Sequence, residues 1–256
     1  MHSSCEWRDY YEKNARSLLE IPWDVGGDLT KNERDAIGES VQGFQAGESS
    51  EGRHLYRYAE KYADISGDRD YLAAIKLFIA EEQRHARDLA RFLHLNDIPT
   101  LKTTFPDRVF RKLRHLFGGL EISIAVLITA EIIAKVYYAA LQQATDSVVL
   151  RSLCEQILRD EMRHVEFQAE QLGKLRYRRH PVLHWITMGL QRFLYWGTCV
   201  VVWQFHKAAF RKGHFGFRRF WKACWAEFHD AFAISKCACD ETWEQFDTIG
   251  GEQHAK

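Results

Sequence analysis

The sequence predicts an all-α protein, organised as a four-helix bundle with a long crossover connection and additional C-terminal helices. The chain of 256 residues contains only four prolines, so long helices are rarely interrupted. Apolar residues recur at steps of three and four over long stretches, and no segment alternates apolar and polar residues as a half-buried strand does. Hydrophobic residues form 46% of the chain and charged residues 27%, which excludes a disordered protein.

The boundaries of the expected helices follow from capping and turn residues. Thr30 and Glu33 have the spacing of a capping box, and Gly67 marks the turn of a first helical hairpin. The loop-like stretch 96–106 is typical of a crossover between two hairpins, and Asp146 marks the turn of the second. The predicted helices cover about residues 7–21, 30–63, 70–95, 119–144 and 148–177. They define an N-terminal helix and lead-in at 1–28, a bundle at 29–178 and a C-terminal extension at 179–256.

The C-terminal extension is basic and rich in aromatic residues. Residues 171–226 contain eleven Lys and Arg and no Asp or Glu, although the whole chain is neutral. The apolar stretch 182–205 is long enough to cross a bilayer, but Gln191 and Arg192 lie inside it and basic clusters flank both ends, so we expect no span. We expect residues 177–226 to contact a membrane peripherally or to bind substrate. The alternative is that they pack on the bundle or on a second subunit of a homodimer.

The location and class of partner are also constrained. The first residues do not form a basic region followed by an apolar stretch, and the six cysteines show no disulfide-like spacing. We therefore expect a cytoplasmic protein, with the extension as its point of peripheral membrane contact. No nucleic-acid-reading motif accompanies the basic charge, so we expect no nucleic-acid partner.

Each of the four predicted bundle helices carries acidic residues in its apolar stripe. Buried carboxylates are costly unless a cation or a donor compensates them, and no Lys or Arg lies near them in these stripes. Glu and His three residues apart project to the same side of a helix, and oxygen and imidazole ligands suit iron or manganese. The pattern therefore predicts a pair of metal ions. The ionisable stripe residues are Glu48, Glu51, Glu82, His85, Glu131, Glu161 and His164.

Their distances from the turns predict that these residues lie at one level, because residues that meet across an antiparallel hairpin are equally far from its turn. Glu51 precedes the first turn by sixteen residues, and Glu82 follows it by fifteen. Glu131 and Glu161 both lie fifteen residues from the second turn. Glu48 lies one helical turn deeper, about 4.5 Å at the rise of an α-helix. We therefore rank Glu48 as an outer-shell or alternative ligand.

The motifs Glu-Glu-Gln-Arg-His at 81–85 and Asp-Glu-Met-Arg-His at 160–164 resemble those of the ferritin-like di-iron carboxylate proteins. In that family two helices each supply a Glu and two others each supply a Glu-x-x-His. The residues of these motifs are similar to those of the oxygen-activating branch, which includes acyl-carrier-protein desaturases and arylamine N-oxygenases. The resemblance covers about residues 33–176. It implies a ferritin-like bundle in which Glu81 and Asp160 accept hydrogen bonds from the ligand histidines. The implied metal ligands are Glu51, Glu82, His85, Glu131, Glu161 and His164.

Departures from the family narrow the expected function. Leu89 stands where a radical-forming reductase subunit would keep its tyrosine, and Ile157 where the N-oxygenases add a histidine. We expect a non-haem di-iron oxidoreductase that activates O₂ to hydroxylate, desaturate or similarly oxidise an apolar or carrier-bound substrate. Its cofactors would be two iron ions, or a manganese and an iron, and a separate electron donor would serve it. The alternatives are a ferritin-like ferroxidase that handles iron and, as the weakest, a membrane-docking scaffold with a structural metal.

Overall fold

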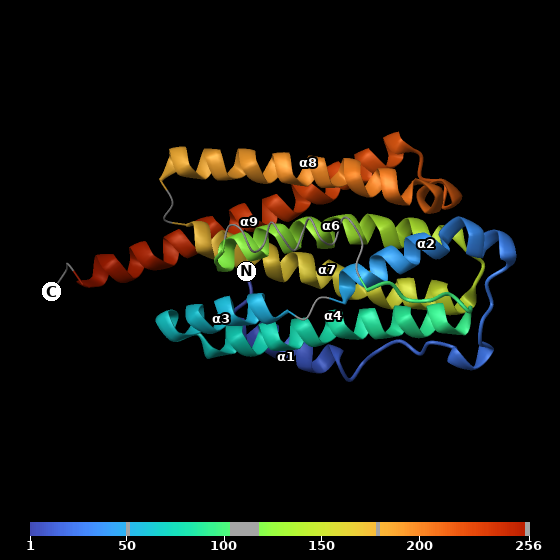
Figure 1. The fold of residues 1–256 in the computed structure, drawn as a ribbon. Helices are drawn as coiled ribbons and strands as arrows, with labels where there is room; N and C mark the ends of the chain where they lie inside the picture. The colour runs from blue at the N-terminus through green and yellow to red at the C-terminus, as the bar shows by residue number, and fades with distance from the viewer. Residues whose placement is uncertain (50–51, 103–117, 178–179, 254–256) are drawn as a thin grey trace.

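The computed structural model describes residues 1–49, 52–102, 118–177 and 180–253, and every regular element in these ranges is helical. The predicted all-α class is therefore confirmed for the described chain. The long helices run roughly along one direction as a bundle, with α1 and α4 at the lower edge of Figure 1 and α8 at the upper edge. The α-helices are α1 (Ser4–Asn14), α2 (Lys31–Glu48), α3 (Arg53–Ser66), α4 (Arg69–Leu95), α6 (Leu120–Ala144), α7 (Val148–Arg176), α8 (Pro181–Lys212) and α9 (Phe217–Gln253).

Helices α4, α6 and α7 lie close to their predicted bounds because their end signals are local. The Asp68 side chain caps the start of α4, and the Ser147 side chain caps the start of α7. Gly67 ends α3 in the left-handed conformation, with φ at 78°. The start of the predicted crossover, up to residue 102, contains no regular helix, and its remainder falls outside the described residues.

Two predicted helices are wrong in extent. The N-terminal helix α1 ends at Asn14 instead of reaching about residue 21. The single helix predicted at 30–63 is divided into α2 and α3, and Gly52 begins α3 with φ at 63°. A side chain at Gly52 would also stand within 2.9 Å of the Ile79 side chain. The chain therefore interrupts its helix at a position where glycine satisfies both the backbone angle and the space.

The apolar interior consists of two clusters that lie one after the other along the bundle. The larger cluster takes side chains from α2, α4, α6, α7, α8 and α9. The smaller cluster takes them from α1, α3, α4, α6 and α7. The helices of the C-terminal extension therefore share the larger core with the bundle.

Helix α6 is the one helix of the described chain that is long and apolar enough to cross a membrane. Of its most apolar window, however, 72% is buried inside the protein. Burial of this extent is typical of a central core helix, which also passes a test of length and composition.

Glu33 connects the start of α2 to the turn between α6 and α7. Its carboxylate accepts hydrogen bonds from the Thr30 hydroxyl at 2.6 Å, the Thr145 hydroxyl at 2.8 Å and the Asp146 backbone N–H at 2.7 Å. Burial acts to raise the pKa of Glu33, but these hydrogen bonds outweigh it and lower the pKa to about 2. The ionised carboxylate therefore stabilises the junction.

We expect Glu33→Gln to lower the free energy of unfolding at pH 7 by about 1–3 kcal/mol, because it loses a charged acceptor of several hydrogen bonds. The folded pKa lies below the unfolded value of about 4.3, so this stabilisation is present above that pH and is lost as the pH falls towards 2. Urea unfolding at a series of pH values measures it. Glu39→Gln, on the exposed side of the same helix, is the control, and a difference that did not change with pH would contradict the assignment.

Candidate metal centre

Carboxylates and imidazoles from four helices converge between the two apolar clusters. They form two groups whose potential ligand atoms lie within 4.8 Å of one another. Glu161 and His164 of α7 are fully buried. One group is Glu48, Glu82, His85 and Glu161, and the other is Glu82, Glu131, Glu161 and His164. Because Glu82 and Glu161 belong to both groups, the two groups form one continuous cluster, and each group has enough ligand atoms that it could hold a metal ion.

The two histidines turn the same ring atom towards the cluster. The Nδ1 atom of His85 lies 3.6 Å from Glu82 Oε1 and 3.7 Å from Glu161 Oε1. The Nδ1 atom of His164 lies 3.1 Å from Glu82 Oε1 and 3.9 Å from Glu131 Oε2. The Glu-x-x-His spacing produces this arrangement, since residues three apart lie on the same face of a helix.

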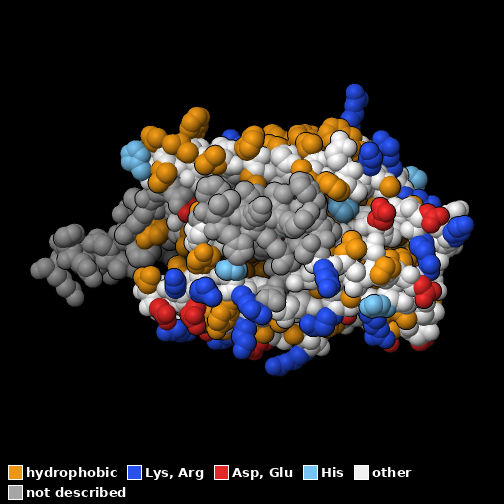
Figure 2. Space-filling model, in the orientation of Figure 1, with side chains coloured by type: hydrophobic (Ala, Val, Ile, Leu, Met, Phe, Trp, Pro, Cys, Tyr) orange, Lys and Arg blue, Asp and Glu red, His pale blue; other side chains and the backbone are white. Residues whose placement is uncertain are grey.

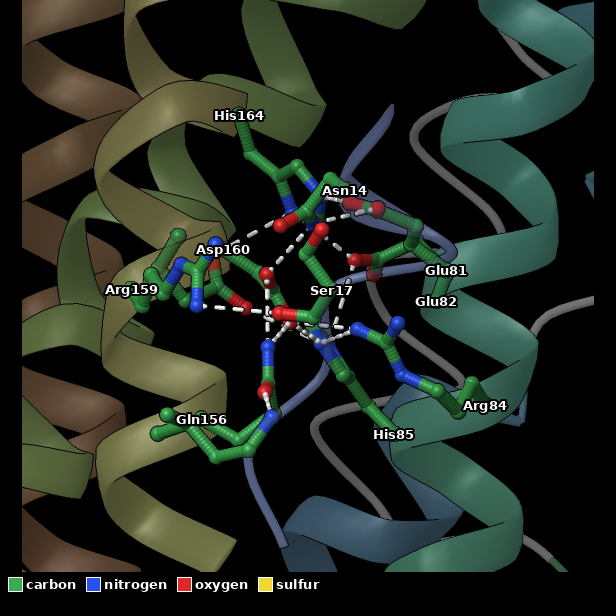
Figure 3. Close-up of polar contacts among 12 residues, drawn as sticks. Asn14, Ser17, Glu81, Glu82, Arg84, His85, Gln156, Arg159, Asp160 and His164 are labelled. Atoms are coloured by element: carbon green, nitrogen blue, oxygen red, sulfur yellow. Dashed lines mark hydrogen bonds and ion pairs between the residues drawn. The ribbon is translucent and has the colours of Figure 1, made fainter. Parts of the chain in front are cut away.

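The acidic residue directly before each Glu-x-x-His binds the Nε2 atom of the histidine on the other helix. The Nε2 atom of His85 lies 3.0 Å from Asp160 Oδ2, and the Nε2 atom of His164 lies 3.0 Å from Glu81 Oε2. Each histidine of one helix thus pairs with a carboxylate of the other, across the interface of α4 and α7 (Figure 3). An Nε2–H bond to a carboxylate fixes the ring orientation and leaves Nδ1 available as a ligand.

The end of α1 covers these contacts. The Asn14 amide nitrogen donates to Glu81 Oε1 at 2.6 Å and to Asp160 Oδ1 at 2.8 Å. The amide of Gln156 donates to Asp160 at 2.9 Å, and Arg84 forms an ion pair with Asp160. Figure 3 shows Asp160 at the centre of this network. Burial acts to raise the pKa of Asp160, but the bond from His85 and the charge of Arg84 hold it well below its usual range.

The carboxylates of the cluster destabilise one another. Burial and the neighbouring charge of Glu131 raise the pKa of Glu161 well above its ordinary value. Burial and Glu82 likewise raise the pKa values of Glu48 and Glu131. Burial acts to lower the pKa of His164, but its contacts with Glu161 and other carboxylates raise it well above its ordinary value. The protein without metal therefore holds protons that metal binding would displace.

Five of the six residues predicted as metal ligands come together: Glu82, His85, Glu131, Glu161 and His164. The sixth, Glu51, lies outside the described residues. Glu48, ranked as an outer-shell or alternative ligand, lies in one of the two groups. Its depth was counted along a single helix at 30–63, whereas α2 ends at Glu48 and α3 begins at Arg53.

Sequence reasoning missed Asn14 and Gln156. Trp7, Tyr11 and Asn14 are the buried residues of α1, at steps of four and three, so Asn14 is a polar residue on an apolar face. That position was a signal of a buried hydrogen-bonding role. Two further contacts steady the carboxylates: the Tyr138 hydroxyl donates to Glu48 Oε1 at 2.7 Å, and the Gln168 amide donates to Glu131 Oε1 at 3.1 Å.

The residues present fit a metal centre. Five buried atoms that face the shared space make no hydrogen bond of acceptable geometry within the described chain: Nδ1 of His85, Nδ1 of His164, Oε1 of Glu82 and both carboxylate oxygens of Glu161. Native proteins rarely leave so many neighbouring polar atoms unsatisfied. Cations would satisfy them together and remove the repulsion among the carboxylates.

We expect anaerobic addition of Fe²⁺ to raise the melting temperature of the metal-free protein, because a ligand that binds only the folded state stabilises it. At one hundred times the dissociation constant the gain is about 2.7 kcal/mol. Glu161→Ala should abolish the shift and keep the helical circular-dichroism signal. Glu155→Ala, an exposed position on the same helix, should retain the shift. An equal shift in Glu161→Ala would show that the metal binds elsewhere.

No protein-family model matches the sequence, and searches of curated proteins and of solved structures find no significant match. The function is therefore inferred from the residues of the site.

Proposed function

We propose that the protein is a non-haem di-iron oxidoreductase that activates O₂ to oxidise an apolar organic substrate. The observation that carries this proposal is the pair of ligand groups that share Glu82 and Glu161 inside the bundle. Two carboxylates common to both groups would hold two ions close enough to act on one O₂ molecule. The proposed fold for this site is the ferritin-like bundle that the motifs resemble.

The chemistry of the donors favours iron, with manganese as a substitute at one position. Among the described residues the cluster offers carboxylate oxygens and imidazole nitrogens and no thiolate, a set that suits iron and manganese. Its four described carboxylates carry four negative charges when ionised, which two divalent ions would balance. Bound reduced iron would supply electrons and open coordination positions for O₂, and a separate electron donor would sustain turnover.

The protein's own residues orient the ligands and exclude water. Asp160 and Glu81 fix the histidine rings, and Asn14 binds both carboxylates. The rings of Tyr11 and Phe78 lie 6.1 Å and 4.7 Å from that of His164, between centroids, and close one side of the cluster. This mostly buried, oriented environment would confine O₂ chemistry to the bound substrate.

The surroundings of the site favour an apolar substrate. A small cavity lies beside the cluster, lined by aromatic and aliphatic side chains such as Phe78 and Phe167 and by Gln168, which contacts Glu131. The cavity has room for about one water-sized molecule, so an organic substrate would require the lining side chains to move. On the surface, an open pocket is lined by three basic residues and one acidic residue, Arg53, Arg57, Lys76 and Glu60. Its net positive charge suits an acidic carrier of the substrate.

We expect the Fe²⁺-loaded protein to react rapidly with O₂ and to oxidise two iron ions per chain, because both positions would contribute electrons. Stopped-flow absorption and oxygen-electrode measurements check this. Glu161→Ala should abolish the reaction, and Glu155→Ala should leave it intact. A loaded wild-type protein that did not consume O₂ would overturn the oxidoreductase proposal in favour of a structural metal.

An excess of Fe²⁺ separates the two iron-dependent functions. An oxidoreductase should stop after the bound ions are oxidised and resume when a reductant is added. A ferroxidase that handles iron should continue to oxidise the excess and accumulate ferric mineral. Continued oxidation with mineral in a large assembly on a sizing column would favour the iron-handling alternative.

A further inference from the structure

Helix α8 has an outer face that is apolar over most of its length. Val182, Ile186, Leu190, Phe193 and Val200 are all exposed, and Phe193 is 81% exposed. Their spacing of mostly three and four residues places them along one side of the helix. In Figure 2 hydrophobic side chains gather along the upper edge of the molecule, where α8 runs. We call this set of five residues the α8 outer face.

The opposite side of α8 packs into the protein interior. Tyr195, Cys199, Trp203 and Phe210 belong to the larger apolar cluster, which includes side chains of α2, α6 and α9. A side chain added at Gly197, on the outer side, would meet no atom of the described residues within 4 Å. The α8 outer face is therefore uncovered in the described chain, and α8 cannot turn it inward without leaving the core.

Basic residues accompany this apolar surface. Lys207 and Arg211 are exposed and follow Val200 on the same side of α8, by helical geometry. Arg192 is exposed beside Phe193, and Trp185, 77% exposed, flanks the N-terminal part of the face. Asp and Glu are absent from the sequence between residues 171 and 226. A partner that covers this surface must therefore accept apolar side chains and several positive charges together.

We propose that the α8 outer face docks on an anionic phospholipid bilayer, with α8 lying parallel to the membrane surface. Apolar and aromatic side chains beside Lys and Arg are typical of helices that lie in the interface, and anionic headgroups complement the basic residues. The packed inner side keeps α8 at the surface and excludes a span. This inference does not depend on the metal centre.

Vesicle flotation tests the proposal directly. The full-length protein should float with phosphatidylcholine vesicles that contain phosphatidylserine and remain unbound with pure phosphatidylcholine, because both apolar insertion and charge attraction are needed. The double variant Leu190→Ser and Phe193→Ser should lose binding by about tenfold or more. Each of Lys207→Gln and Arg211→Gln should weaken binding by about fivefold, an effect that added salt should mimic.

The matched control is Ile65→Ser, which removes an apolar side chain that is 89% exposed on α3, and it should bind as the wild type does. Circular dichroism verifies that every variant is folded. Failure of the wild type to float, or flotation unaffected by the Leu190 and Phe193 substitutions, would overturn the proposal. A dimer that the same substitutions dissociate, seen by sedimentation in the absence of vesicles, would instead assign the α8 outer face to self-association and overturn it as well.

Discussion

The mutual repulsion of carboxylates in the bundle core is the constraint on which the rest of the structure depends. Glu131 and Glu161 are buried and Glu48 and Glu82 nearly so, and an isolated charge in such a place would cost several kcal/mol. The surrounding helices oppose that cost with directed contacts: the amide of Gln168 reaches Glu131, and the hydroxyl of Tyr138 reaches Glu48. Such a cluster reduces the stability of the metal-free protein, which is typical of sites retained for function.

Two carboxylates outside the cluster, Asp160 and Glu81, set the orientation of its histidines. Asp160 and Glu81 attract the Nε2 sides of the histidines, so the Nδ1 sides face the shared carboxylates. These two carboxylates need donors of their own. Asn14 of α1 donates to both, and Arg84 of α4 forms an ion pair with Asp160. The N-terminal helix is therefore part of the site, although the sequence places it outside the four-helix pattern.

The extent to which sequence predicted this structure depends on how local the determining forces are. The bounds of α4 and α7 were predictable, because Asp68 and Ser147 cap helices within three residues of themselves. The meeting of Glu82, Glu131 and Glu161 followed from helical periodicity and equal distances from turns. The division between α2 and α3 was missed, although Gly47, Ser49 and Gly52 are weak helix formers and were a local signal for it. The structure adds that Gly52 has a positive φ and that a side chain there would clash with Ile79. The docking of α1 and the exposure of α8 depend on packing between distant segments, which periodicity does not report.

The contacts of Asn14 have a consequence for the order in which the protein is made. Asn14 binds Glu81 and Asp160, which follow it in the chain by 67 and 146 residues. During synthesis the first helix emerges from the ribosome long before Glu81 and Asp160 are translated, so Asn14 lacks these two hydrogen-bond partners until later. The histidine-orienting network is complete only after α7 has been translated and has folded against α4. If the proposed site takes up metal in this finished geometry, it does so late in the maturation of the chain, after the N-terminal helix has docked on α4 and α7.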